Sequence, residues 1–183
     1  MDPLVDATGQ PYSYTGDDPV NLVDPNGLAP YNYTFDLGLN SIPPAQLATF
    51  LRQNCSTVFA VSGCPDNFQV GQELPLATHI AGFTESFPVC VTSIGASSFT
   101  LTALPGHPEG ADRTITFTFE QGSDGEDLLN VHTSSNGSLL TKPPLEIPDF
   151  LIAKSTWASM AAGFEWAYAQ AQYLKSQGEV GDV

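Results

Sequence analysis

The segment that most constrains the fold is residues 114–119, where threonines alternate strictly with Ile115, Phe117 and Phe119. Strict alternation of polar and large apolar side chains is typical of a β-strand with one face buried and the other in solvent. Residues 87–91 and 99–103 show the same period of two. Residues 128–133 follow a Gly-Ser-Asp-Gly turn and are predicted to form a hairpin with residues 114–119. The chain is therefore predicted to contain an antiparallel sheet.

Two predicted helices flank these strands. The first opens at residues 41–44 and runs to about Asn54, with an apolar face made by Leu47, Phe50 and Leu51. The second follows a proline-rich linker at residues 142–148 and is longer. Its apolar residues recur at helical spacing and would lie across the sheet: Trp157, Met160, Phe164, Ala167, Ala171 and Leu174.

The ends of the long helix carry their own signals. Ser155 is a candidate N-cap if the helix starts late, and Gly178 is a candidate terminator. The order of elements predicts an α+β fold: an antiparallel β-sheet packed against a long C-terminal helix, with one shorter N-terminal helix before the sheet.

The charge balance limits the possible functions. Five lysines and arginines stand against 20 aspartates and glutamates, a formal net charge of −15 at pH 7. Nucleic-acid binding depends on cations that neutralise phosphates, so a nuclease is disfavoured and no nucleic-acid partner is expected. Anionic membrane surfaces would also repel this chain. With 42% hydrophobic and only 14% charged residues, the composition is that of a folded domain.

Targeting and cysteine patterns add two expectations. No basic segment followed by an apolar core opens the chain, and no apolar stretch is long enough for a membrane span, so neither a signal peptide nor a span is expected. Cys55 and Cys64 lie nine residues apart and can form a disulfide in an oxidising compartment. The alternative is that these two and Cys90 are buried thiols.

Residues 12–28 carry a resemblance to a known family. Their sequence is Tyr-Ser-Tyr-Thr-Gly-Asp-Asp-Pro-Val-Asn-Leu-Val-Asp-Pro-Asn-Gly-Leu. This resembles the C-terminal end of the core of Rhs/YD-repeat proteins, where a proline, four residues and Asp-Pro-x-Gly-Leu mark the border with a variable toxin. Pro19 and residues 24–28 fit that pattern without a gap. Asp2 begins an earlier Asp-Pro pair at the family's spacing, although Val5 replaces the usual glycine.

The resemblance implies two parts: a short β-rich Rhs core tail over residues 1–28 and a variable C-terminal effector domain over residues 29–183. Many Rhs proteins cut themselves after the leucine of this motif, so Asp2 and Asp24 would be the self-cleavage pair and Leu28 would precede the cut bond. Two close carboxylates can share a proton, one activating water and the other polarising the carbonyl. Ordinary turn formation before proline explains both aspartates equally well.

The same resemblance implies partners and a destination. The toxin would be made in the bacterial cytoplasm, enclosed by the Rhs core shell and delivered as a secreted effector into a target cell. A cognate immunity protein would neutralise it. The reaction and the cofactor do not follow from the sequence.

A second resemblance covers residues 104–110, Leu-Pro-Gly-His-Pro-Glu-Gly, followed by a predicted strand. This segment is similar to a signature of a bacterial family of unknown function with the helix-grip, START-like fold. The resemblance bears on the fold more than on the chemistry.

The loop Pro105–Arg113 is the best candidate for a catalytic site, because it joins two patterned strands and concentrates functional groups. Nearby carboxylates, such as Glu109, would raise the pKa of His107 and suit it to general-base catalysis. Arg113 can clamp a carboxylate or phosphate on a ligand. The alternatives are a rigid turn with a solvated His107, and an ion pair of Arg113 with Glu109 or Asp112.

His132 is the remaining catalytic candidate. It lies on the strand after the hairpin and faces either a cavity or solvent. An ADP-ribosyltransferase is a minor alternative, since Arg113, residues 132–135 and Glu146 supply fragments of its motif at the wrong spacing. The three histidines are too far apart for a metal site to follow from spacing alone, and no nucleophile elbow, P-loop or dinucleotide motif occurs.

Three functional hypotheses follow. The first is the C-terminal toxin domain of an Rhs-type effector. The second is a START-like domain that binds a small hydrophobic ligand between sheet and long helix without catalysis. The third is an inert structural end of an Rhs gene.

Overall fold

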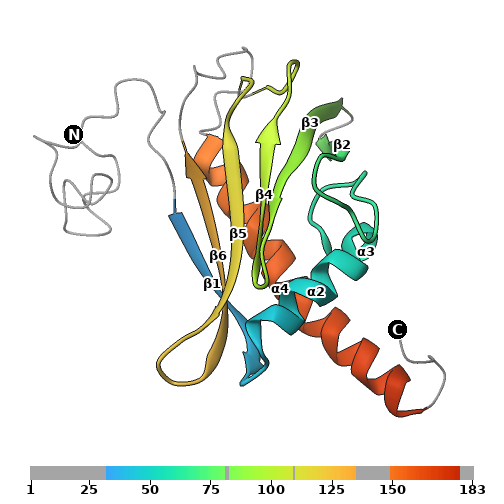
Figure 1. The fold of residues 1–183 in the computed structure, drawn as a ribbon, viewed down its shortest axis with the longest axis vertical. Coiled ribbons are helices and arrows are strands. Elements are labelled where there is room, and N and C mark those ends of the chain that lie inside the picture. The colour runs from blue at the N-terminus through green and yellow to red at the C-terminus, as the bar shows by residue number, and fades with distance from the viewer. Residues whose placement is uncertain (1–31, 81–82, 109, 135–148, 178–183) are drawn as a thin grey trace, which may run out of the picture.

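A computed structural model describes residues 32–80, 83–108, 110–134 and 149–177 (Figure 1). The six strands are β1 (Asn32–Asn40), β2 (Glu73–Ile80), β3 (Phe83–Ile94), β4 (Ser98–Ala103), β5 (Thr114–Gln121) and β6 (Glu126–Ser134). The helices are α2 (Pro44–Gln53), α3 (Cys55–Val58) and α4 (Asp149–Ser176). The predicted Rhs core tail, with Asp2, Asp24 and Leu28, lies outside the described residues.

All six strands form one antiparallel sheet in the order β1-β6-β5-β4-β3-β2. The sheet curls around α4, which runs diagonally across one face, and α2 and α3 close one end of that face (Figure 1). The α+β prediction is therefore confirmed. We call the space between the sheet and α4 the grip.

The alternating segments behave as their sequence predicts. Along β4 and β5 the inward side chains Phe99, Leu101, Phe117 and Phe119 are buried, whereas the threonines between them are only partly buried. Outward hydroxyls then pair across the strands, as between Thr100 and Thr116 or between Thr92 and Thr102, with oxygens 2.9 Å apart in both pairs. The sheet thus has an apolar inner face and a threonine-rich outer face.

Two strands and one short helix are absent from the sequence prediction. The strand β1 carries inward Phe35, Leu37 and Leu39, and β2 carries buried Leu74 and Leu76, so both have the period of two. In β1 the pattern is interrupted by an irregularity in pairing to β6 between Asp36 and Asn40. These two strands form the edges of the sheet.

The strand β1 approaches α4 closely at Gly38. Its φ of +67° lies in the left-handed region, and a Cβ placed on it would come within 2.6 Å of Glu165 Oε2 on α4. The side chain of Asp36 accepts a 2.9 Å hydrogen bond from the Gly38 N–H and fixes the bend. Glycine satisfies both the backbone conformation and the close approach of the helix.

The helix α4 begins earlier than the capping signal predicts. It starts at Asp149, so Ser155 lies inside the helix and is not its N-cap. Its inward side chains are Met160, Phe164 and Tyr168, all buried. Gly178 lies outside the described residues. None of the described helices combines the length and the hydropathy that crossing a bilayer requires.

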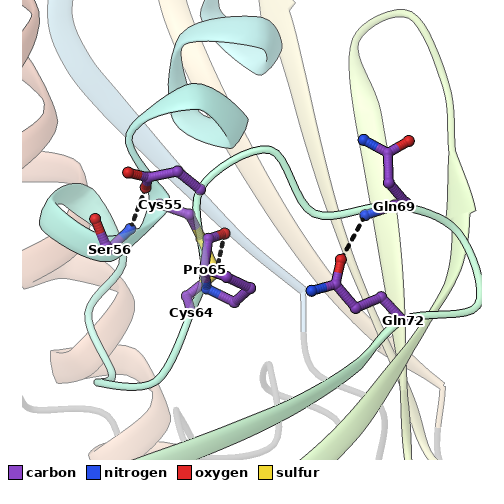
Figure 2. The surroundings of a disulfide bond; sticks show 7 residues. Cys55, Ser56, Cys64, Pro65, Gln69 and Gln72 are labelled. Atoms are coloured by element: carbon purple, nitrogen blue, oxygen red, sulfur yellow. Dashed lines mark hydrogen bonds between the residues drawn. A yellow bond between two sulfur atoms is a disulfide. The ribbon is translucent and has the colours of Figure 1, made fainter.

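A disulfide joins Cys55 in α3 to Cys64, in the loop that leads to β2 (Figure 2). Both cysteines are buried, whereas Cys90 is a free, half-buried thiol. Beside the bridge, the side chain of Asp66 accepts a 2.8 Å hydrogen bond from the Ser56 N–H. Of the two alternatives for these cysteines, the structure has the disulfide.

The start of α2 is held by a buried carboxylate. Asp127 of β6 has no exposed surface and accepts a hydrogen bond from the Ile42 N–H, at 3.1 and 3.2 Å to its two oxygens. Ser41, with φ of +60°, donates its N–H to the Gly125 carbonyl at 2.9 Å. These contacts fasten α2 across the end of the sheet where β5 turns into β6.

Candidate functional site

The middle of the grip is filled with aromatic rings. Phe99 stacks on Phe117 with ring centroids 4.8 Å apart, and Trp157 of α4 meets Phe117 edge-on at 5.0 Å. Nearer to α2, Phe119 lies 5.6 Å from Phe164 of α4. These rings close the space between sheet and helix toward α2, and Trp157, which lies about two turns before Phe164 on α4, borders the other end.

The opposite end of the grip is more open. It is formed by the beginnings of β1, β3 and β5 and the ends of β4 and β6, as the strand registers require. Inward apolar residues change from buried to half-buried as the strands approach it, from Phe117 to Ile115 and from Val89 to Phe87. We define the open end by Tyr33, Phe87, His107, Arg113, Ile115 and Trp157.

The loop predicted as the best site lies at this open end. It is a series of tight turns: the His107 N–H donates to the Leu104 carbonyl at 3.0 Å, and the Gly110 N–H donates to the His107 carbonyl at 3.0 Å. Its base is closed by the Ala103 N–H, which donates to the Arg113 carbonyl at 2.7 Å. These hydrogen bonds hold the described residues of the loop backbone in place.

His107 differs from the sequence expectation in its environment. Its ring is half-buried and meets the Phe87 ring edge-on at 5.6 Å, so it is not a fully solvated turn residue. Burial, and secondly the positive charge of Arg113, lower the pKa of His107 to about 4. The shift is opposite in direction to the expected rise, firstly because the ring is buried and secondly because Arg113 is near it. A histidine this weakly basic is poorly suited to general-base catalysis near neutral pH.

The structure brings only some of the predicted residues together. His107 and Arg113 lie at the open end, Asp112 is exposed with φ of +67°, and Glu109 lies outside the described residues. His132 is exposed on the outer face of the sheet, in register with Asn32 and Thr116. It faces solvent rather than the grip, so it does not share a site with His107.

Three residues of the open end were not singled out as site residues from sequence. Tyr33 is half-buried at the start of β1, and burial raises its pKa. Phe87 contacts His107, and Trp157 packs against Phe59 at 5.8 Å as well as Phe117. The only sequence signal for Tyr33 and Phe87 is their place in an alternating strand.

Trp157 carries the most informative atom of this region. Its Nε1–H is buried and has no hydrogen-bond acceptor among the described residues. A buried donor without an acceptor costs about 1–3 kcal/mol, so such groups in folded proteins usually have a partner. No group of three histidines, cysteines, aspartates or glutamates suited to a metal ion occurs within the described ranges.

No protein-family model matches the sequence, and no curated protein matches it. Solved structures do match the fold. The START superfamily protein from Mycobacterium smegmatis has a TM-score of 0.55 at 14% identity and covers 78% of this chain and 98% of that protein. Ara h 8.0201 has a TM-score of 0.54 at 14% identity, and protein MLL2253 from Mesorhizobium loti has 0.54 at 15%, each with the same coverage.

The fold is a START-like helix-grip. At identities this low the likeness shows the fold alone. It confirms the fold that the resemblance of residues 104–110 implies.

Proposed function

We propose that this domain binds a small hydrophobic ligand at the open end of its grip and has no catalytic role of its own. The observation that carries the proposal is that the apolar side chains of Phe87, Ile115 and Trp157 are only half-buried. Their surface continues the buried inner face of the sheet. Apolar surface that is concave and bordered by a few polar groups is the usual composition of a ligand site.

The polar groups at this site suit recognition better than chemistry. His107 is neutral near pH 7 because its pKa is about 4, so it offers one donor and one acceptor without charge. The Nε1–H of Trp157 supplies a second donor that a ligand oxygen can accept from. Tyr33 stays protonated, since burial raises its pKa. An apolar ligand with one or two oxygen atoms would satisfy these groups.

The test is native mass spectrometry of the full chain purified from bacteria under mild conditions. We expect a second population, heavier by the mass of a lipid-sized molecule, that organic solvent removes. Two variants place the ligand: Trp157→Phe removes the indole donor at the open end, whereas His132→Ala changes only the outer face. The first should lose part of the bound population and the second should keep it. Only the bare mass in every preparation, even after incubation with lipid extract, would contradict the proposal.

The junction motif of residues 12–28 favours a second candidate function. In that proposal the domain is the cargo of an Rhs shell, released by cleavage after Leu28 and neutralised by a cognate immunity protein. A helix-grip domain that binds a hydrophobic ligand is compatible with such a position in a longer chain.

Fusion to a full Rhs shell tests this second candidate. We expect cleavage between Leu28 and Ala29, which Asp24→Asn abolishes, and toxicity of the released domain that the product of a neighbouring gene relieves. An intact fusion with both aspartates present would contradict the self-cleavage, and harmless expression would contradict the toxin.

A further inference from the structure

A second concave site lies outside the grip, between α2 and the C-terminal half of α4. It is a groove of about 440 Å³, within the range of small-molecule sites. On α2 it is lined by side chains that point away from the buried face of Leu47, Ala48 and Leu51. The α4 side belongs to the part of the helix beyond Phe164, so the groove shares no residue with the open end.

Carboxamides dominate this groove. Five of its ten lining residues are asparagine or glutamine, and no aspartate or glutamate is among them: Gln46, Gln53, Asn54, Asn67 and Gln172. The groove is therefore neutral apart from Lys175, although the chain as a whole carries 20 acidic residues. Each carboxamide offers two donor hydrogens and an acceptor oxygen, so the groove can hydrogen-bond densely without charge.

Part of this carboxamide set is already fixed and part is available. The Gln46 amide donates to the Tyr168 hydroxyl at 2.8 Å, and the Asn54 amide donates to the Phe50 carbonyl at 2.9 Å. The side chains of Gln53 and Asn67 make no hydrogen bond with another described residue. Gln172 is also held, because its side chain hydrogen-bonds the Tyr168 hydroxyl, so the fixed groups shape the groove while Gln53 and Asn67 can bind a ligand.

One wall of the groove is aromatic. Phe50 is half-buried, and its ring is held edge-on by Phe164 at 5.3 Å and by Tyr168 at 5.0 Å. Burial raises the pKa of Tyr168, so its hydroxyl stays neutral. An aromatic ring beside neutral donors and acceptors suits a molecule with one apolar C–H face and a rim of hydroxyl groups.

We infer that the groove is a binding site for a neutral saccharide of about one or two rings. Sugar hydroxyls both donate and accept, as carboxamides do, and the C–H face of a pyranose packs on an aromatic ring. An anionic ligand is disfavoured, because Lys175 is the one cation lining the groove and the chain carries a net charge of −15. This site is independent of the ligand proposed for the grip.

The test is a titration of the isotope-labelled full chain, followed by amide chemical shifts. The probes are maltose, cellobiose, lactose, mannobiose and diacetylchitobiose, each up to about 20 mM, which detects dissociation constants in the millimolar range. We expect at least one disaccharide to produce saturable shifts that cluster on α2 and on the C-terminal half of α4.

Matched variants place the site. Gln53→Leu should weaken the binding by at least about fivefold, the loss expected for a hydrogen-bonding group. Gln170→Leu removes an exposed carboxamide of α4 that does not line the groove and should leave binding unchanged. The inference is overturned if no probe gives saturable shifts, if the shifts cluster at the open end, or if Gln53→Leu binds like the wild type.

Discussion

At the scale of single residues, a few positions are determined by two constraints at once. Gly38 has a positive φ and leaves no room for a Cβ beside the Glu165 side chain, and Asp127 is buried beneath the turn leading to α2. The His107 ring packs against the Phe87 ring, and its pKa is lowered by burial and by the charge of Arg113. At such positions a conservative substitution has a direction of effect that the structure predicts.

Two glycines should respond to alanine in opposite directions. Gly38→Ala should lower the free energy of unfolding by about 1–2 kcal/mol, the cost of a Cβ in the left-handed region, with a further cost if Glu165 cannot move aside. Gly163 lies in α4 with open space around it, so Gly163→Ala should raise stability by about 0.5–1 kcal/mol. Urea denaturation of both variants measures the difference; equal effects would show that the approach of β1 and α4 is described wrongly.

The low pKa of His107 predicts a specific dependence on pH. In the unfolded chain a histidine binds its proton near pH 6.5, but in the folded protein His107 does so only near pH 4. Below pH 6.5 the unfolded state therefore binds more protons, and stability falls as the pH decreases toward 4. Above pH 6.5 both states are neutral at this residue and the effect is absent.

His107→Gln should remove this part of the acid destabilisation. The thermal midpoint of the variant should fall less than that of the wild type between pH 6.5 and pH 4, and the same offset should persist below pH 4. His132→Gln is the matched control, because that side chain is exposed on the outer face. Parallel pH profiles for wild type and His107→Gln would mean that His107 titrates normally.

At the scale of elements, the disulfide and α4 determine how well the grip is closed. The helix α3 has four residues and is too short to be stable alone. Its position therefore depends on its packing against α4 and on the disulfide between Cys55 and Cys64. Phe59 follows α3 directly and contributes to the aromatic cluster with Phe117 and Trp157. The disulfide therefore supports one wall of the grip.

Loss of the disulfide should be measurable. In the chain-entropy view, a bridge closing a loop of this size contributes about 2.5 kcal/mol. The double variant Cys55→Ser, Cys64→Ser should be less stable by about that amount in urea denaturation, and reductant should no longer affect it. Cys90→Ser keeps the bridge and should respond to reductant as the wild type does. If reductant does not change the wild type's stability, the bridge is not formed in solution.

The sequence predicts elements well where side-chain patterns are local. The β5 segment Thr114–Gln121 alternates without interruption, and α2 follows prolines suited to a first turn. The sequence does not predict the edge strand β1, because Gly38, whose φ is positive, and the irregular pairing with β6 interrupt the alternation. The start of α4 does not follow from the sequence, because Ser155 is a cap only if the helix starts late, and the helix begins at Asp149.

The site was harder to predict because its residues meet only in the fold. Tyr33 and Trp157 come from opposite ends of the chain, and no motif connects them. The structure places His107 and Arg113 of the predicted loop at the open end, and the pKa of His107 is lowered there rather than raised. Glu109 is nearer to His107 in sequence than Arg113 is, and only the fold shows that burial and Arg113 act on the ring.

At the scale of the whole molecule, the inner face of the curled sheet differs in burial between its two ends. Toward α2 it is packed with aromatic rings and stabilises the domain, and toward the open end its side chains are only half-buried. Because the net charge is −15, a neutral or apolar ligand would meet no electrostatic repulsion on approach. We propose that this second part of the inner face binds a hydrophobic molecule.

The most direct measurement of that claim is a fluorescence titration with the neutral apolar probe N-phenyl-1-naphthylamine. The wild type should bind it saturably with a dissociation constant in the micromolar range, about −8 kcal/mol. Ile115→Gln places an amide at the open end and should weaken binding at least about tenfold. Thr118→Gln, outward on the same strand, should not change it. No saturable binding, or equal binding by both variants, would contradict a ligand site at the open end of the grip.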